Sequence, residues 1–268
     1  MLADDDPAAS VLIGSGLSSE VFLHGTDRVL KLYREPSEAS AIENEFRATA
    51  LAHERGLPAA RPIALLRRDG RHGILFERLH GETMLRHYAK NPLGMMLALR
   101  RLALIQYAMH GETAGDLPAQ RERLRNDIGQ ARVPEVIREA ALVALDQLPG
   151  GVALCHNDIH PGNVLCTPDG LALIDWQKAG AGCAAGDVAR TELMIRYGRL
   201  PAHRGGKADR LRGLAADWYV RCYRSASGLG RAEIRAWHLP LMVARLCARR
   251  TDKDEQILGV VDRLMKAA

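Results

Sequence analysis

The segment from His156 to Asn163, together with Asp175 twelve residues further on, constrains this chain more than any other feature. The residues between them, 164–174, read as a short hairpin with a Pro-Asp-Gly turn in its middle. Such a hairpin would return Asp175 to the neighbourhood of Asp158 and Asn163. The sequence therefore predicts that two carboxylates and an amide oxygen gather at one point.

These three side chains have the chemistry of a phosphoryl-transfer site. Mg²⁺ takes oxygen ligands and keeps several waters, so Asn163 and Asp175 suffice as the protein's metal ligands. Asp158 is then free to accept or orient the proton of a substrate hydroxyl. We expect His156 to support this loop through hydrogen bonds to the backbone rather than to take part in catalysis.

A lysine in the middle of an apolar strand is the second candidate for a functional role. Lys31 lies in the strand expected at 28–33, and the helix expected after it, which stops at Gly56, carries Glu43 and Glu45. In kinases, a glutamate on such a helix holds the strand lysine against the α- and β-phosphates. We expect Glu45 to be the partner of Lys31, and the alternative is that all three charges simply face solvent.

The Gly-containing turn at 14–20 is a candidate for covering the nucleotide phosphates. It lies between two expected strands, and glycine allows backbone N–H groups, here at Ser15 and Gly16, to approach an anion closely. The turn lacks a complete G-x-G-x-x-G pattern, so an ordinary hairpin turn is the alternative.

A hinge between two lobes is expected where the strand at 73–79 runs into His80-Gly81, just before the chain becomes helical. Backbone amides and carbonyls at such a hinge could hold the edge of an adenine ring. Glu77 and Leu79 are the residues that we expect to contribute them.

A chain of 268 residues, 47% of them hydrophobic, is long enough for two lobes around a cleft. We expect an α+β fold with a nucleotide-binding lobe at 1–79, made of a small antiparallel sheet and one helix that Ser37 or Ser40 caps. The larger, mainly helical lobe at 80–268 would carry the catalytic and substrate-binding residues. The helix expected at 92–111 is apolar on nearly every face and should be buried.

Composition excludes several classes of protein. No apolar stretch reaches the length of a membrane span and the acidic start is unlike a signal peptide, so we expect a cytoplasmic protein without a membrane partner. Five cysteines without a C-x-x-C pair argue against disulfides and a zinc site. A dispersed net charge of +5 does not indicate nucleic-acid binding. The oligomeric state stays open.

The order of these features resembles the aminoglycoside phosphotransferase and choline kinase-like family, which has a bilobal protein-kinase-like fold. The best-matching stretch is 154–176, LCHNDIHPGNVLCTPDGLALIDW, and Asp187 resembles the structural aspartate that opens a helix in this family. At Asn157 the aminoglycoside enzymes usually carry glycine, and asparagine is more typical of the choline kinase-like branch. The resemblance implies ATP as donor, Mg²⁺ as cofactor, and these site residues: Lys31 and Glu45 at the phosphates, Asp158 as base, and Asn163 and Asp175 on the metal.

The spacing after the motif favours a small hydroxyl compound as acceptor. Only eleven residues separate Asp175 from Asp187, which leaves little room for the segment on which a protein kinase holds its peptide substrate. A catalytically silent nucleotide-binding regulator is a further alternative, but the lysine, the base and the metal ligands are all present.

Among small acceptors, charge favours a neutral or anionic compound. Residues 187–268 contain 17 Lys plus Arg against 9 Asp plus Glu, whereas a polycationic aminoglycoside needs an acidic pocket. Three alternatives remain open. An aminoglycoside could be held by Glu192, Asp209 or Asp217, and an anionic group could be bound by Arg245, Arg249 or Arg250. A choline-like amino alcohol would need an aromatic cage, for which the candidates are Trp176, Tyr197, Trp218, Tyr219, Tyr223 and Trp237.

Overall fold

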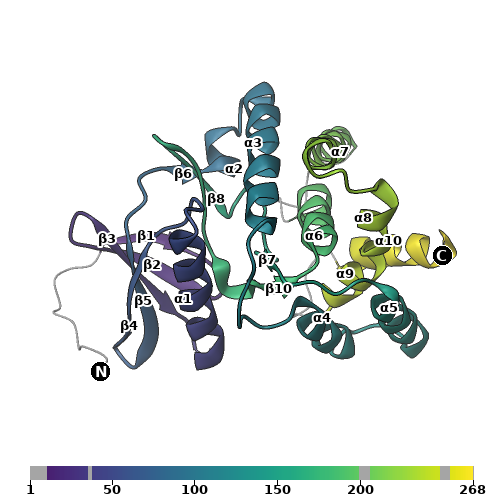
Figure 1. Ribbon diagram of the computed structural model, residues 1–268, viewed down its shortest axis with the longest axis horizontal. Coiled ribbons are helices and arrows are strands. Elements are labelled where there is room, and N and C mark those ends of the chain that lie inside the picture. The colour runs from purple at the N-terminus through teal and green to yellow at the C-terminus, as the bar shows by residue number, and fades with distance from the viewer. Residues whose placement is uncertain (1–10, 36–37, 199–205, 248–253, 268) are drawn as a thin grey trace.

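The structure is a computed structural model that describes residues 11–35, 38–198, 206–247 and 254–267. An antiparallel sheet forms the N-terminal end, and the remainder is mainly helical (Figure 1). The predicted α+β class is therefore confirmed. Of the helices in the described ranges, none is long and apolar enough to cross a membrane.

Five strands form the N-terminal sheet in the order β1-β2-β3-β5-β4, and all neighbours are antiparallel. The strands are β1 (Leu12–Ser15), β2 (Ser19–His24), β3 (Arg28–Tyr33), β4 (Pro62–Arg68) and β5 (Arg71–Glu77). The helix α1 (Ala39–Glu54) packs on this sheet and also against the turn that follows Asp175. Figure 1 shows α1 between the sheet and the helical remainder.

Alternation along β3 determines which side chains meet α1. Side chains of a strand point alternately to its two faces. Leu30 and Leu32 therefore pack together on one face of the sheet, whereas Tyr33 joins Ile42 of α1 in a separate cluster. Lys31 shares its face with Tyr33, and so it faces α1 as well.

The start of α1 differs from the expected one. The helix begins at Ala39 after Glu38, and no side chain caps it. Ser40 lies inside the first turn, and Ser37 lies outside the described residues. A helix held by burial of Ile42 and Ala48 against the sheet and the core does not depend on a cap for its position.

Short strands carry the motif segment at the boundary between the sheet and the helices. The hairpin of β8 (Val164–Thr167) and β9 (Gly170–Leu173) forms as expected, and β6 (Glu82–Thr83) joins its edge. The strand β7 (Ala153–Cys155) delivers the motif and pairs with β10 (Gly180–Gly182). The sequence did not reveal β6 or β10, because two or three residues are too few to show a pattern.

Helices surround these strands and enclose the main hydrophobic core. They are α2 (Met84–His87), α3 (Pro92–His110), α4 (Gln120–Gly129), α5 (Glu135–Gln147), the 3₁₀ turn η1 (Trp176–Lys178), α6 (Ala184–Tyr197), α7 (Lys207–Ser227), α8 (Arg231–Ala236), α9 (His238–Ala244) and α10 (Asp254–Ala267).

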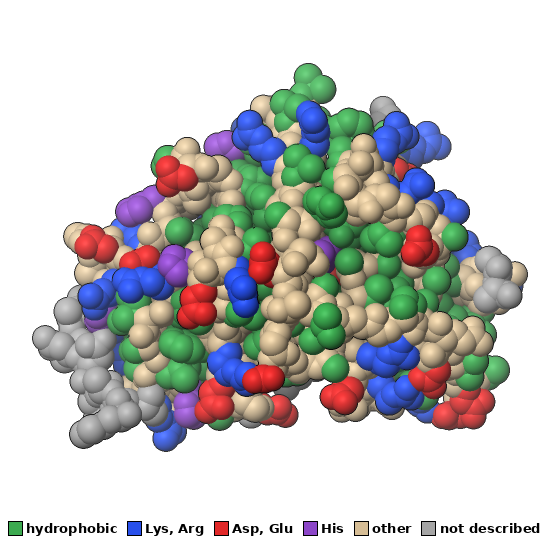
Figure 2. Space-filling view, in the orientation of Figure 1, with side chains coloured by type: hydrophobic (Ala, Val, Ile, Leu, Met, Phe, Trp, Pro, Cys, Tyr) green, Lys and Arg blue, Asp and Glu red, His purple; other side chains and the backbone are tan. Residues whose placement is uncertain are grey.

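The expectation that α3 is buried on nearly every face is wrong. Leu102 and Met109 are fully buried, but Leu93 is 80% exposed and Leu97 is 62% exposed. Figure 2 shows hydrophobic side chains among basic ones at the top edge of the molecule, where α3 lies in Figure 1. When a helix is apolar on all sides, its own sequence does not indicate which side the neighbouring elements will cover.

Candidate active site

The hairpin brings the motif residues together. The backbone N–H of Ile174 donates to the carbonyl of Asn163 over 3.0 Å, so the end of β9 lies beside the start of β8. The side-chain amide of Asn163 donates to the carbonyl oxygen of Asp158 over 3.0 Å. Because the amide nitrogen is used in this way, the amide oxygen is the atom left to bind a metal. Asp175 comes two residues after the end of β9 and lies close enough to Asp158 for the two charges to interact.

Two residues of the site adopt a left-handed backbone, Asn157 with φ 61° and Asp175 with φ 66°. Asn and Asp tolerate this conformation better than other residues with a side chain, and such strain is typical of functional sites. The side chain of Asn157 is held by a 2.6 Å hydrogen bond from Gln120 and by its own bond to the carbonyl of Lys178.

Lys31 bridges the N-terminal sheet and the motif. Its ammonium lies 2.6 Å from Glu45 Oε1 and 2.8 Å from Asp175 Oδ1. Burial alone would lower the pKa of Lys31, but the carboxylates of Glu45 and Asp175 outweigh it and raise the pKa. The structure thus places Glu45, rather than Glu43, against a lysine that stays protonated.

Neighbours on β3 and α1 hold this pair in place. The hydroxyl of Tyr33 donates to Glu45 Oε2. Asn44, next to Glu45 on α1, donates to the carbonyls of Gln177 and Ala179, which lie just after Asp175. One helix therefore positions the partner of Lys31 and fixes the turn beyond Asp175.

Asp158 is a largely buried carboxylate beside two cations. Its side chain is 14% exposed, with Lys178 Nζ 2.9 Å from Oδ2 and Arg190 Nη2 4.0 Å from Oδ1. Burial alone would raise the pKa of this carboxyl, but Lys178 and Arg190 outweigh it and hold the pKa well below its ordinary value. Asp158 is therefore ionised and can accept a hydrogen bond from a hydroxyl at neutral pH.

His156 contacts protein groups in the interior. Its Nε2 donates to the carbonyl of Ile174 over 3.2 Å, and its ring lies against that of Trp176 with a centroid separation of 4.6 Å. Burial lowers the pKa of His156, so the ring is neutral. These contacts suit the supporting role expected of it.

Asp187 anchors the loop that carries Asp158. Its buried carboxylate accepts hydrogen bonds from the backbone N–H groups of His156, over 3.1 Å, and Asn157, over 2.7 Å, and from the side chain of Gln106 over 3.0 Å. Burial alone would raise the pKa of Asp187, but His110, His156 and the hydrogen bond from Gln106 outweigh it and lower the pKa. The residue thus has the contacts of a structural aspartate.

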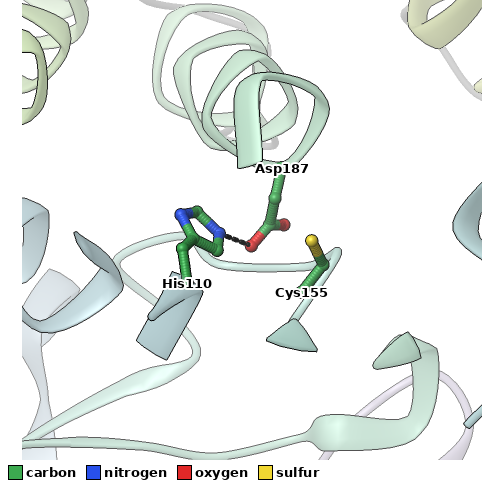
Figure 3. A group of neighbouring side chains, drawn as sticks. All are labelled: His110, Cys155 and Asp187. Atoms are coloured by element: carbon green, nitrogen blue, oxygen red, sulfur yellow. Dashed lines mark hydrogen bonds and ion pairs between the residues drawn. The ribbon is translucent and has the colours of Figure 1, made fainter. Parts of the chain in front are cut away.

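His110, Cys155 and Asp187 lie close enough together to suggest a metal site (Figure 3). Nε2 of His110 donates to Asp187 over 3.1 Å, and Nδ1 forms a 2.6 Å hydrogen bond with the hydroxyl of Tyr223. Burial raises the pKa of the Cys155 thiol well above its ordinary value, which disfavours the thiolate that binds metals. Because His110 and Asp187 already bond to protein groups, we interpret the three residues as part of the anchor for the loop that carries Asp158.

Asp187→Ala is expected to lower the free energy of unfolding by about 3–5 kcal/mol, because buried donors lose a charged acceptor. Urea denaturation of the variant measures this loss. Asp262→Ala is the control, since Asp262 is exposed on α10 and a surface change of this kind typically stays within about 0.5 kcal/mol. Equal losses in the two variants would contradict the anchoring role.

The turn between β1 and β2 is less suited to phosphates than expected. The N–H of Gly16 donates to the carbonyl of Ser19 over 2.8 Å, which closes the turn on itself. The hydroxyl of Ser15 accepts from Arg34 over 2.9 Å. In this conformation the Gly16 amide is used by the hairpin, as in the alternative reading of an ordinary turn.

The predicted adenine contacts differ from each other in their surroundings. The backbone N–H of Glu77 donates to the carbonyl of Arg61, and its carboxylate pairs with the Arg61 guanidinium at 2.6 Å. Glu77 is thus part of the sheet. Leu79 lies beyond the end of β5, in the segment expected to form the hinge.

A cavity of about 590 Å³ lies beside the predicted hinge and the turn of the β8-β9 hairpin. Gly81 and Arg101 are among its lining residues, and Lys31, Asp158 and Asp175 are not. The cavity is therefore distinct from the charged site described above.

Two of the three acidic residues considered for an aminoglycoside are engaged elsewhere, and the third, Asp209, is exposed on α7. Glu192 is fully buried and pairs with Arg196, Arg231 and His238 at 2.8–3.1 Å. Asp217 pairs with the same two arginines. This network joins α6 to α7, α8 and α9, and so it leaves neither carboxylate free to attract a cationic substrate.

The aromatic and basic candidates are also engaged. Trp176, Tyr219, Tyr223 and Trp237 are at most 1% exposed and belong to the core. Trp218 donates to a backbone carbonyl of α3. Arg245 donates to the carbonyls of Leu193 and Tyr197 near the end of α6, whereas Arg249 and Arg250 lie outside the described residues.

Sequence reasoning missed the cations around Asp158. Lys178 comes three residues after Asp175 at the end of η1, and Arg190 comes one helical turn after Asp187 on α6. The spacing of Lys178 from Asp175 and of Arg190 from Asp187 is the signal that could have revealed them. In a helical turn, residues i and i+3 lie on the same side of the helix axis.

Comparison with known proteins supports this picture. The sequence model of a family described as the phosphotransferase enzyme family matches residues 11–223. A comparison with curated protein sequences finds no match.

Solved structures with the same fold include aminoglycoside phosphotransferase APH(3'')-Id from Streptomyces rimosus, which is 18% identical with a TM-score of 0.59 over 87% of this chain and 93% of that one. A thermostable mutant of aminoglycoside phosphotransferase APH(4)-Ia, in complex with AMP-PNP and hygromycin B, is 16% identical with a TM-score of 0.69 over 97% and 94%. A choline/ethanolamine kinase family protein from Mesorhizobium loti is 16% identical with a TM-score of 0.65 over 97% and 88%. At these identities the likeness shows the fold and confirms the predicted kinase-like architecture.

Proposed function

The chain belongs to the phosphotransferase enzyme family, and we propose that it transfers the γ-phosphoryl group of ATP to a hydroxyl of a small molecule. The observation that carries this proposal is the position of Lys31, whose ammonium contacts both Glu45 and Asp175 at one end of the site that holds Asp158 and Asn163. In this proposal, the strand lysine, the helical glutamate, the base and the metal ligands come from four separate segments of the chain. Since ATP is the donor, we place the protein in the cytoplasm.

Lys31 would bind the nucleotide phosphates. A protonated amine held by Glu45 keeps its direction while still offering hydrogen-bond donors. Its contact with Asp175 places it at the boundary between the sheet and the motif, where phosphates would lie in a kinase-like fold.

The donor set fits Mg²⁺. The side-chain nitrogen of Asn163 donates a hydrogen bond to the Asp158 carbonyl, which leaves the side-chain oxygen of Asn163 as a possible metal ligand. Asp175 stays ionised, because Lys31 outweighs the effect of burial and lowers the pKa of Asp175. Oxygen ligands of this kind suit a hard cation, which when bound would neutralise charge on the phosphates.

Asp158 would receive the acceptor hydroxyl. The hydroxyl oxygen forms a bond to the γ-phosphorus, the bond to the bridging oxygen breaks with its electron pair leaving on ADP, and the hydroxyl proton passes to Asp158 or solvent. A carboxylate with a depressed pKa is a weak base, so its main contribution is to orient the hydroxyl.

The acceptor is small in this proposal. The segment between η1 and α6 is occupied by β10, which pairs with β7 and forms no platform for a peptide. Aminoglycosides and choline-like amino alcohols remain candidates by family resemblance. The engaged state of Glu192, Asp217 and the aromatic residues disfavours both.

Binding of ATP tests the proposal before any acceptor is known. At an ATP concentration 100-fold above its Kd, we expect stabilisation of about 2.7 kcal/mol, seen as a rise in Tm that is larger with Mg²⁺. Lys31→Met should reduce the ATP-induced rise, because the phosphates lose their cation. Lys90→Met, at an exposed position, should keep it. If ATP changes the Tm under neither condition, the proposal fails.

A further inference from the structure

Arg190 is held in the site without a hydrogen-bond partner for its Nε. It lies on α6, whose first turn buries Asp187, and the one-turn spacing brings both residues to the side of the helix that faces the motif. Its side chain is only 14% exposed, and Nε is buried with no partner among the residues that the structure describes. Its Nη2 is 4.0 Å from Asp158, which is too long for a hydrogen bond.

Arg123 of α4 lies in the same neighbourhood. Burial lowers its pKa, and the nearby charge of Arg190 lowers it further. Asp127 and Asp158 are the carboxylates close to this pair. Two partly buried guanidinium groups of like charge are costly for the fold unless an anion lies near them, and clustered buried charges of this kind are typical of functional sites.

The charges around Asp158 therefore leave a surplus of cations. Lys178 donates to Asp158 over 2.9 Å and so neutralises the charge of that carboxylate. Asp127 is the other carboxylate whose charge interacts with Arg190 and Arg123. An ammonium group on the acceptor would meet three cations here, whereas an anion would meet unused guanidinium donors.

Guanidinium groups bind carboxylates and phosphates through paired hydrogen bonds with a fixed geometry. We infer that the acceptor carries an anionic group, a carboxylate or a phosphate, which Arg190 binds with help from Arg123 while the hydroxyl points at Asp158. This inference rests on the proposed function and names the class of its substrate. It accounts for a largely buried guanidinium whose Nη2 lies near Asp158 without a hydrogen bond to it, and for the proximity of two like charges.

Binding of four matched probes tests the inference directly. Glycerate, glycerol 3-phosphate, glycerol and 3-aminopropane-1,2-diol share a three-carbon backbone with hydroxyls and differ in charge. Each is added to the protein saturated with AMP-PNP and Mg²⁺, so that the nucleotide's own phosphate positions are filled. We expect at least one of the two anions to raise the Tm, and the neutral and cationic probes to have no effect.

Variants then locate the effect. Arg190→Gln should weaken binding of the stabilising anion by about 10- to 100-fold, the loss typical of a charged hydrogen-bonded pair. Arg123→Gln should weaken it less, and Arg221→Gln, at an exposed position on α7, should match the parent protein. Circular dichroism and an unchanged affinity for AMP-PNP show that the variants are folded.

The outcomes separate this inference from the proposed function. If neither anion stabilises the parent protein more than Arg190→Gln, or if the cationic probe binds best, the anionic acceptor is excluded while ATP binding still stands. If AMP-PNP and Mg²⁺ themselves fail to bind, the proposed function fails and this inference fails with it. Glycerate and glycerol 3-phosphate together distinguish a carboxylate site from a phosphate site. Arg190→Gln should raise the KM for an anionic acceptor more than it lowers kcat, whereas an arginine acting only on the transferred phosphate would lower kcat.

Discussion

Asp158→Asn is expected to lower turnover by about 10²-fold or more, with the affinity for ATP and Mg²⁺ nearly unchanged. Asparagine keeps the shape of the side chain but cannot take a proton, and it offers the acceptor hydroxyl a weaker, neutral oxygen. Steady-state kinetics with the acceptor found from the probes, together with nucleotide titration, measure both quantities.

The depressed pKa of Asp158 adds a second expectation for this variant. Because Lys178 and Arg190 keep the carboxyl ionised far into the acidic range, the turnover of the parent protein should not fall through protonation of Asp158 near neutral pH. Asp169→Asn is the matched control, since Asp169 is exposed in the turn of the β8-β9 hairpin. Unchanged turnover in Asp158→Asn would remove Asp158 from the catalytic site.

Parts of the site could be predicted because their geometry is local. A two-strand hairpin between Asn163 and Asp175 fixes their proximity through its own turn chemistry, and the structure has that hairpin at β8 and β9. The pairing of Lys31 with Glu45 was also within reach. Alternation along β3 turns Lys31 towards α1, and the helix then turns Glu45 inwards, leaving it 1% exposed.

Other parts depend on contacts between distant elements. Spacing relates Lys178 to Asp175 and Arg190 to Asp187, but nothing in the sequence relates these two cations to each other or to Arg123 of α4. The same limit explains α3, where Leu93 and Leu97 are exposed although nothing in their segment distinguishes them from buried neighbours.

Local pattern left two readings open at the turn between β1 and β2. A glycine between strands fits both a phosphate-binding loop and an ordinary hairpin, and the difference lies in where the Gly16 N–H points. In the structure it points at the Ser19 carbonyl. The order of strands and helices was predicted more reliably because it follows from residue patterns along the chain. The direction of a single backbone amide does not follow from such a pattern.

Asp175→Asn is expected to abolish the dependence of nucleotide binding on Mg²⁺ and to lower turnover by about 10²-fold or more. Asp175 is the only charged side chain among the two proposed metal ligands, so its loss leaves a neutral oxygen pair that binds a hard cation weakly. The variant also loses the ion pair with Lys31, which frees the ammonium for the phosphates. Binding of ATP without metal should therefore persist.

A spectroscopic readout separates metal binding from activity. Electron paramagnetic resonance of Mn²⁺, used in place of Mg²⁺ with AMP-PNP present, should show bound metal in the parent protein and in Asp169→Asn but little in Asp175→Asn. Asn163→Ala should give an intermediate result, because it removes a neutral ligand and leaves the carboxylate. If Asp175→Asn binds Mn²⁺ as tightly as the parent protein, the metal lies elsewhere and the left-handed turn at Asp175 serves to hold Lys31 instead.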